Sequence, residues 1–219
     1  MSEPPTPAKR QRGCLFYGCI AGAACLVAIL LAFLLLLHMF KQALNQFTDT
    51  KPAPLPTVNL TQPEIEELQR KFDAFKDATS SGRPTPPLAL SSDEINGLLA
   101  NSPEFKDAKG KIYLKVEDDH LKAQVSVPMT NLGLTVFKGR YLNGTGTFKI
   151  AVQNGLLIIS PMDLFVKGKP LPESYMVKIR QQNFATGINN NSQASVAFNK
   201  LQSIEMRDGK LTLVPKVEK

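Results

Sequence analysis

The chain has 219 residues, of which 43% are hydrophobic and 21% charged, and its formal net charge is +7. The first 87 residues are taken up by a tail, an apolar run, a spacer and one helix, so the remainder suffices for one compact domain of the commonest size, about 100 to 150 residues. All three cysteines lie within the apolar run, which leaves the rest of the chain without the usual ligands of a zinc site.

The apolar run begins at Cys14 and continues without a charge to Leu37. A helix that crosses a bilayer needs roughly 20 such residues, so the run predicts a transmembrane helix over 14–38. Bulky residues follow it instead of a cleavage site, so we expect a retained anchor. The basic residues of "AKRQRG" directly precede it and predict a cytoplasmic tail over 1–13, with the rest of the chain outside the cytoplasm.

The next two segments are expected to be a spacer and a helix. Prolines in "DTKPAPLPT" predict an extended stand-off over 39–60. The N-cap Thr61 and the acidic first turn predict an amphipathic helix over 61–79, followed by a linker over 80–87. This helix carries apolar residues at the spacing of a coiled-coil seam, namely Ile65, Leu68, Phe72 and Phe75. The stripe either packs onto its own domain or forms a partner helix for self-association.

The remaining segment, 88–219, combines short helices with strands. A helix is expected from Ser92 or Asp93 to near Pro103, and another over about 172–185, followed by a polar loop. Alternating residues predict a hairpin over 112–127, and two further hairpins turn at Asn154-Gly155 and Asp208-Gly209. The predicted fold class is α+β, with a single transmembrane helix followed by a helix-backed antiparallel β-sheet domain.

The strand after Asn154-Gly155 is apolar from Leu156 to Ile159. Both of its faces are therefore expected to be covered, one by the core and the other by a helix, a lipid or a partner. This makes Leu157 and Ile159 candidate ligand-binding residues. Gly144 and Gly146 join them, because a glycine within a strand marks a bulge or a close approach to the backbone.

Several segments resemble the membrane-anchored extracytoplasmic proteins of the YpmS type in order and spacing. They are "LSSDEINGLL" at 90–99, "NGLLI" at 154–158 and "VKGKPLP" at 166–172, followed by a helix. The resemblance covers roughly residues 88–186. It implies an anchored envelope domain with an apolar groove, and it transfers no catalytic residue.

The sequence predicts a membrane-anchored extracytoplasmic binding or scaffolding module for a lipid or an envelope partner. His120 is the sole histidine base outside the membrane flank, and it lies in the polar turn "EDDH". We therefore expect no enzyme activity, no cofactor and no metal. The alternative is an envelope hydrolase or transferase that uses carboxylates such as Asp163 and Glu173. The basic balance is typical either of a solvated surface with scattered lysines or of one that attracts anionic lipid or polymer, and the location argues against nucleic acid.

Overall fold

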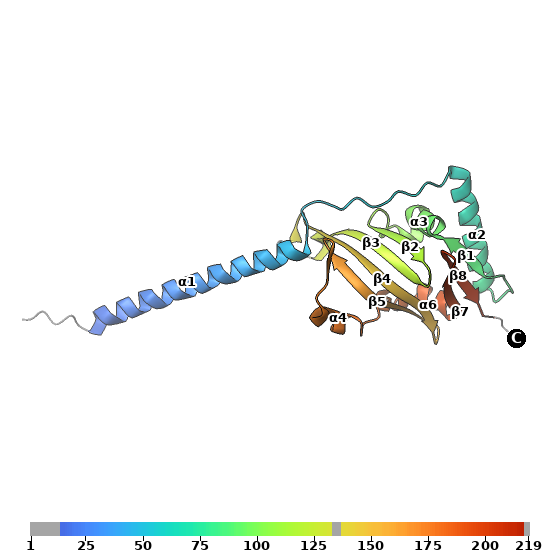
Figure 1. Ribbon diagram of the computed structural model, residues 1–219. Helices are drawn as coiled ribbons and strands as arrows, with labels where there is room; N and C mark the ends of the chain where they lie inside the picture. The colour runs from blue at the N-terminus through green and yellow to red at the C-terminus, as the bar shows by residue number, and fades with distance from the viewer. Residues whose placement is uncertain (1–13, 133–136, 217–219) are drawn as a thin grey trace, which may run out of the picture. The chain divides into compact units, whose positions relative to one another are not determined.

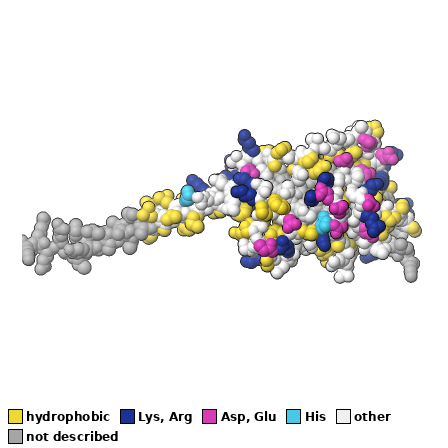
Figure 2. Space-filling view, viewed as in Figure 1, with side chains coloured by type: hydrophobic (Ala, Val, Ile, Leu, Met, Phe, Trp, Pro, Cys, Tyr) yellow, Lys and Arg dark blue, Asp and Glu magenta, His cyan; other side chains and the backbone are white. Residues whose placement is uncertain are grey.

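The computed structural model describes residues 14–132 and 137–216, and it divides the chain into two compact units, Met1–Gln46 and Phe47–Lys219. Helix α1 (Cys14–Phe47) begins in the first unit and ends at the first residue of the second (Figure 1). Its stretch Ile29–Phe47 is long and apolar enough to cross a membrane, by length and composition. Figure 2 shows hydrophobic side chains on the part of this helix that is coloured by type there. The tail predicted over 1–13 lies outside the described residues.

The segment after the apolar run differs from the predicted spacer. Helix α1 continues to Phe47, because "HMFKQALNQF" contains good helix formers and no glycine or proline. The following residues lie on the second unit: Asp49 and Tyr141 form an antiparallel bridge, with N···O distances of 2.8 and 2.7 Å in the two directions. The segment from Thr48 onward is therefore fixed to the second unit, and the expected stand-off is absent there.

The second unit contains two antiparallel sheets. The larger has the order β2 (Ile112–Glu117), β3 (His120–Pro128), β4 (Tyr141–Gln153), β5 (Leu156–Val166) and β6 (Lys169–Pro170). The smaller has the order β1 (Leu88–Ser91), β8 (Lys210–Pro215) and β7 (Leu201–Arg207). The α+β class and the three predicted hairpins are confirmed. The strands form two sheets instead of one, because β1, which the sequence did not indicate, pairs with β8.

The helices of the second unit are α2 (Gln62–Ser80), α3 (Ser92–Asn101), α4 (Glu173–Ile179), α5 (Thr186–Asn189) and α6 (Ser192–Asn199). Single turns of 3-10 helix occur at Pro103–Phe105 and Met129–Leu132. Helices α2 and α3 each begin with a capping box, in which a hydroxyl residue and a glutamate three residues later satisfy each other's backbone amides. The helix predicted over 172–185 ends at Ile179, and the predicted polar loop after it contains α5 and α6.

Helix α2 is part of the core of the second unit. The cluster of buried side chains joins α2, β1, α3 and β7 through Leu68, Phe75, Leu88, Leu90, Leu98 and Leu201. Gly97 permits this packing, since a Cβ there would lie 2.6 Å from Leu60 and 3.2 Å from Leu68. The compact unit therefore begins at Phe47 and includes α2, whereas the sequence placed its boundary at residue 88.

Side chains from α3, from α5 and from the loop between α4 and α5 bond to the outer strand β2 and to the part of β5 that β6 does not pair. At the β2 edge, the side chain of Asn96 accepts from Leu114 N (2.8 Å) and donates to Leu114 O (2.5 Å). At the β5 edge, Leu157 N donates to Asn189 (3.0 Å) and Ile159 N donates to Asn183 (2.9 Å). Unpaired strand edges invite other strands to pair, and these asparagines occupy the backbone groups that such pairing would use.

Candidate functional site

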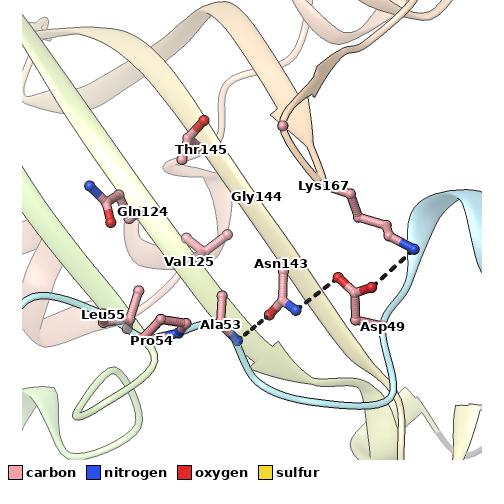
Figure 3. Close-up of a pocket in the computed structure, with 11 residues that line it drawn as sticks. Asp49, Ala53, Pro54, Leu55, Gln124, Val125, Asn143, Gly144, Thr145 and Lys167 are labelled. Atoms are coloured by element: carbon pink, nitrogen blue, oxygen red, sulfur yellow. Dashed lines mark hydrogen bonds and ion pairs between the residues drawn. The ribbon is translucent and has the colours of Figure 1, made fainter.

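A cavity of about 290 Å³ lies where the segment after α1 crosses the larger sheet (Figure 3). One wall comes from the segment itself, and the others come from the middle of β3, the first half of β4 and the turn after β5. The lining residues are Asp49, Ala53, Pro54, Leu55, Gln124, Val125, Asn143, Gly144, Thr145, Lys167 and Gly168. Part of the lining is apolar, and on one side amide and charged side chains lie together.

Asn143 is the centre of the polar side of this cavity. It is 8% exposed, and its amide makes four hydrogen bonds. Its Oδ1 accepts from Ala53 N at 3.0 Å and from Ser126 Oγ at 2.9 Å. Its Nδ2 donates to Asp49 Oδ2 and to Lys51 O, both at 2.9 Å. Because the amide has two donors and two acceptor sites, its capacity is filled, and three of these bonds hold the segment 49–53 against β4.

Asp49 links this amide to the basic side chain of Lys167, and a second basic side chain, Arg140, lies nearby. Lys167 Nζ lies 3.0 Å from Asp49 Oδ1, and Arg140 Nε donates to the hydroxyl of the neighbouring Thr48 at 2.6 Å. The hydrogen bond from Lys167 lowers the pKa of Asp49 below its ordinary value, and the bond from Asn143 and the charges of Lys167 and Arg140 act in the same direction. The carboxylate of Asp49 is thus ionised at neutral pH, at the start of the segment that follows α1.

Acid is expected to release this segment. A carboxyl whose pKa is lower in the folded chain stabilises the fold above its unfolded pKa of about 3.9, and this stabilisation is lost as the pH falls through the folded value. The protection factor of the Ala53 amide, which is the intrinsic exchange rate divided by the observed rate, should therefore fall below about pH 4. In Asp49→Asn, exchange at Ala53 should already be faster at neutral pH and should lose this acid step. An acid step of the same size in Asp49→Asn would assign it to another carboxylate.

The four residues that the sequence suggested as ligand-binding do not form one site. Gly144 lies in the cavity wall, where a Cβ would come within 2.9 Å of Phe165 O. A Cβ on Gly146 would meet Leu164 and Phe148, both at 2.7 Å, so its space is filled by side chains of the sheet. Leu157 and Ile159 lie toward the other end of β5, where Leu157 is 5% exposed and Ile159 is half-buried.

The apolar stripe of α2 faces its own unit. Leu68 and Phe75 are buried in the core cluster, at 4% and 8% exposure. Phe72 packs against that cluster and contacts the ring of Phe105, with centroids 6.5 Å apart. Ile65 is half-buried. Of the two alternatives for this stripe, the structure shows packing onto its own domain.

The two carboxylates suggested for hydrolysis also lie apart from the cavity. Glu173 forms an ion pair with Arg180 at the two ends of α4, and Asp163 is exposed on β5, opposite Thr147 of β4. Neither lines the cavity of Figure 3. Within the described ranges, no group of three or more His, Cys, Asp or Glu side chains is arranged to hold a metal ion.

Sequence analysis missed Asp49, Asn143 and Lys167 as members of one site. The hydrogen bond between Asp49 and Asn143 joins residues 94 positions apart, and no local pattern signals such a contact. The one usable signal was the dipeptide Lys167-Gly168, whose positive φ values of 54° and 73° are typical of a tight turn between strands. That turn carries Lys167 at the end of β5.

The fold is that of an α+β protein with two antiparallel sheets and one apolar helix long enough to cross a membrane. Residues that follow this helix closely in the sequence form part of the lining of a cavity with both polar and apolar walls. Comparison with protein-family models, curated proteins and solved structures found no match.

Proposed function

We propose that this chain is a single-pass membrane protein with a cytoplasmic N-terminus, and that its second unit is a non-enzymatic module that binds a membrane lipid outside the cytoplasm. The observation that carries the proposal is the fixed segment 48–55, which forms one wall of the cavity directly after the candidate span. A binding module on a free spacer could lie far from the bilayer. We infer that the fixed segment 48–55 keeps the second unit at the bilayer surface.

Chain length limits how far the cavity lies from the end of the span. An extended chain covers at most about 3.6 Å per residue, so Asp49 is within about 7 Å of Phe47 and Ala53 within about 22 Å. A headgroup layer is about 5 to 8 Å thick on each side of the hydrocarbon core. If α1 spans the bilayer, the near side of the cavity is at headgroup depth and a lipid can enter it without leaving the membrane surface.

The chemistry of the cavity suits part of an amphipathic ligand. Its volume of about 290 Å³ is at the lower limit of small-molecule sites, about 300 to 1,000 Å³. Val125, Pro54 and Leu55 offer apolar surface, whereas Gln124 and Thr145 offer hydrogen-bonding groups. In a lipid, the glycerol backbone forms hydrogen bonds and the adjoining part of an acyl chain is apolar. We therefore expect the cavity to hold this part of one lipid.

The test is native mass spectrometry of the full chain, released from lipid nanodiscs, with lipid analysis of what remains bound. We expect one lipid per chain in the wild type and loss of that lipid in Thr145→Phe, which places a ring in the cavity wall. Thr147→Phe is the matched control, because Thr147 lies two residues along the same strand and outside the cavity lining. A lipid retained equally by both variants, or absent from the wild type, would contradict the proposal.

A further inference from the structure

Large apolar side chains are exposed on and just after helix α4, on the same unit as the cavity. The exposed fractions are 54% for Tyr175, 52% for Val177, 44% for Phe184 and 41% for Ile188. Between the first two, Met176 points into the unit and is 2% exposed. Helix α4 therefore has an inward anchor, Met176, with the exposed side chains of Tyr175 and Val177 on its two flanks, and large apolar side chains exposed on one element mark a place of interaction.

One contact joins this surface to the first residue of the second unit, Phe47. The ring of Tyr175 packs edge-on against the ring of Phe47, with centroids 6.3 Å apart and an interplanar angle of 73°. Phe47 is the last residue of the stretch long and apolar enough to cross a membrane. For a span that extends to Phe47, the ring of Tyr175 lies about one ring diameter from its end, and tyrosine is enriched at that depth because its ring is apolar and its hydroxyl polar.

The charges near this surface are mostly basic. Lys169 and Lys178 are exposed on the segment that carries α4. The acidic residue of the helix, Glu173, is engaged by Arg180, which also donates to Met162 O at 3.2 Å. Basic side chains beside apolar ones favour a surface of anionic headgroups, to which each positive charge is attracted.

We propose that the outward side of α4, formed by Tyr175, Val177 and Lys178, docks in the anionic headgroup layer of the membrane that α1 spans. This inference rests on the anchoring in the proposed function and extends it to a second, independent contact with the bilayer. A unit attached by one helix rotates about its attachment point, whereas a unit held at α1 and at α4 keeps one orientation. The cavity beside Asp49 then faces the bilayer at a constant angle.

The chain contains no tryptophan, so single tryptophans report depth without background. The full chain is reconstituted in vesicles of phosphatidylcholine and phosphatidylglycerol, with bromine placed on the acyl chains either near the carbonyl or near the terminal methyl. Tyr175→Trp and Val177→Trp test the proposal. Leu36→Trp, within the span, tests the anchor, and Tyr113→Trp on β2 is the control on the sheet.

We expect bromines near the carbonyl to quench Tyr175→Trp and Val177→Trp about twofold, and Tyr113→Trp not at all. Leu36→Trp should be quenched by the deep bromines. Removing phosphatidylglycerol, or adding Lys178→Glu, should reduce the quenching at position 177. Circular dichroism verifies that each variant is folded. Val177→Trp keeps the native contact between Phe47 and Tyr175, so it reports depth even where Tyr175→Trp loses that contact.

Each contrary result has a distinct meaning. Quenching of Leu36→Trp without quenching at 175 and 177 would overturn the docking of α4 and leave the anchor in place. No quenching of Leu36→Trp would overturn the anchor, and with it both proposals. A blue-shifted emission at 175 and 177 without quenching by bromine would show a protein as the occupant, such as a second copy of the chain, and would also overturn the docking.

Discussion

Replacing Asn143 by leucine is expected to lower the free energy of unfolding by about 3 to 5 kcal/mol. The substitution keeps the branching and the number of non-hydrogen atoms of the side chain and removes all four of its hydrogen bonds. A hydrogen bond contributes about 0.5 to 1.5 kcal/mol, and more where a charged group takes part, so the loss of four accounts for this range. Ser126 Oγ still accepts from Ala53 N at 3.1 Å and Asp49 keeps its ion pair with Lys167, so the destabilisation comes from the bonds of Asn143 itself.

Two measurements together test this result. Urea unfolding in detergent, followed by circular dichroism, gives the free energy, and hydrogen exchange at Ala53 reports whether segment 48–55 has detached. Thr145→Val is the control, because Thr145 is exposed on the same strand and also lines the cavity. If Asn143→Leu retains the slow exchange of Ala53, the hydrogen bonds of Asn143 are not what holds the segment to the sheet.

The functional consequence follows from the same substitution. Segment 48–55 supplies a wall of the cavity and also limits its distance from the span. A detached segment would become the flexible spacer that the three prolines of "KPAPLP" suggest. We therefore expect Asn143→Leu to lose the lipid even where the larger sheet remains folded.

The elements that could be predicted are those specified by neighbouring residues. The hairpin at Asn154-Gly155 has φ values of 52° and 76°, and the hairpin at Asp208-Gly209 has 52° and 70°. These left-handed conformations are what asparagine, aspartate and glycine accept at low cost, so the dipeptides alone locate the turns. Thr61 and Glu64 likewise specify the start of α2, since both partners of the capping box lie within one helical turn.

The elements that could not be predicted depend on partners distant in sequence. Asn183 and Asn189 satisfy the edge of β5. The sequence placed Asn183 in the helix predicted over 172–185 and Asn189 in the polar loop after it, and neither pattern signals an edge cap. The tripeptide Asn143-Gly144-Thr145 matches a glycosylation acceptor, yet its asparagine is buried with every hydrogen-bonding position filled. In both cases the residue type allows several roles, and only the tertiary partner selects one.

The apolar strand Leu156 to Ile159 could likewise be predicted only in part. Its run of apolar residues indicated that both faces are covered. In the structure Leu157 is buried, whereas Leu156 is 44% exposed at the hairpin turn. The cover at its edge is polar. Asn183 and Asn189 donate to Leu157 O at 2.9 and 2.8 Å, which periodicity of apolar residues could not reveal.

Replacing Leu68 by alanine is expected to destabilise the second unit by about 2 to 5 kcal/mol, the range for large-to-small changes in a packed core. Leu68 is 4% exposed in the cluster that joins α2 to β1, α3 and β7. It lies close to Gly97 of α3, so the space vacated there is bounded by backbone and collapses poorly. Urea unfolding of the full chain in detergent measures the loss.

Ile65→Ala is the matched control, because Ile65 belongs to the same stripe and is only half-buried. If α2 is core, Leu68→Ala should cost at least about twice as much as Ile65→Ala, and sedimentation should give the same mass for the wild type and both variants. A self-associating helix would behave differently: both substitutions would lower the mass at a given concentration by similar amounts. That outcome would require α2 to leave the core cluster when two chains meet.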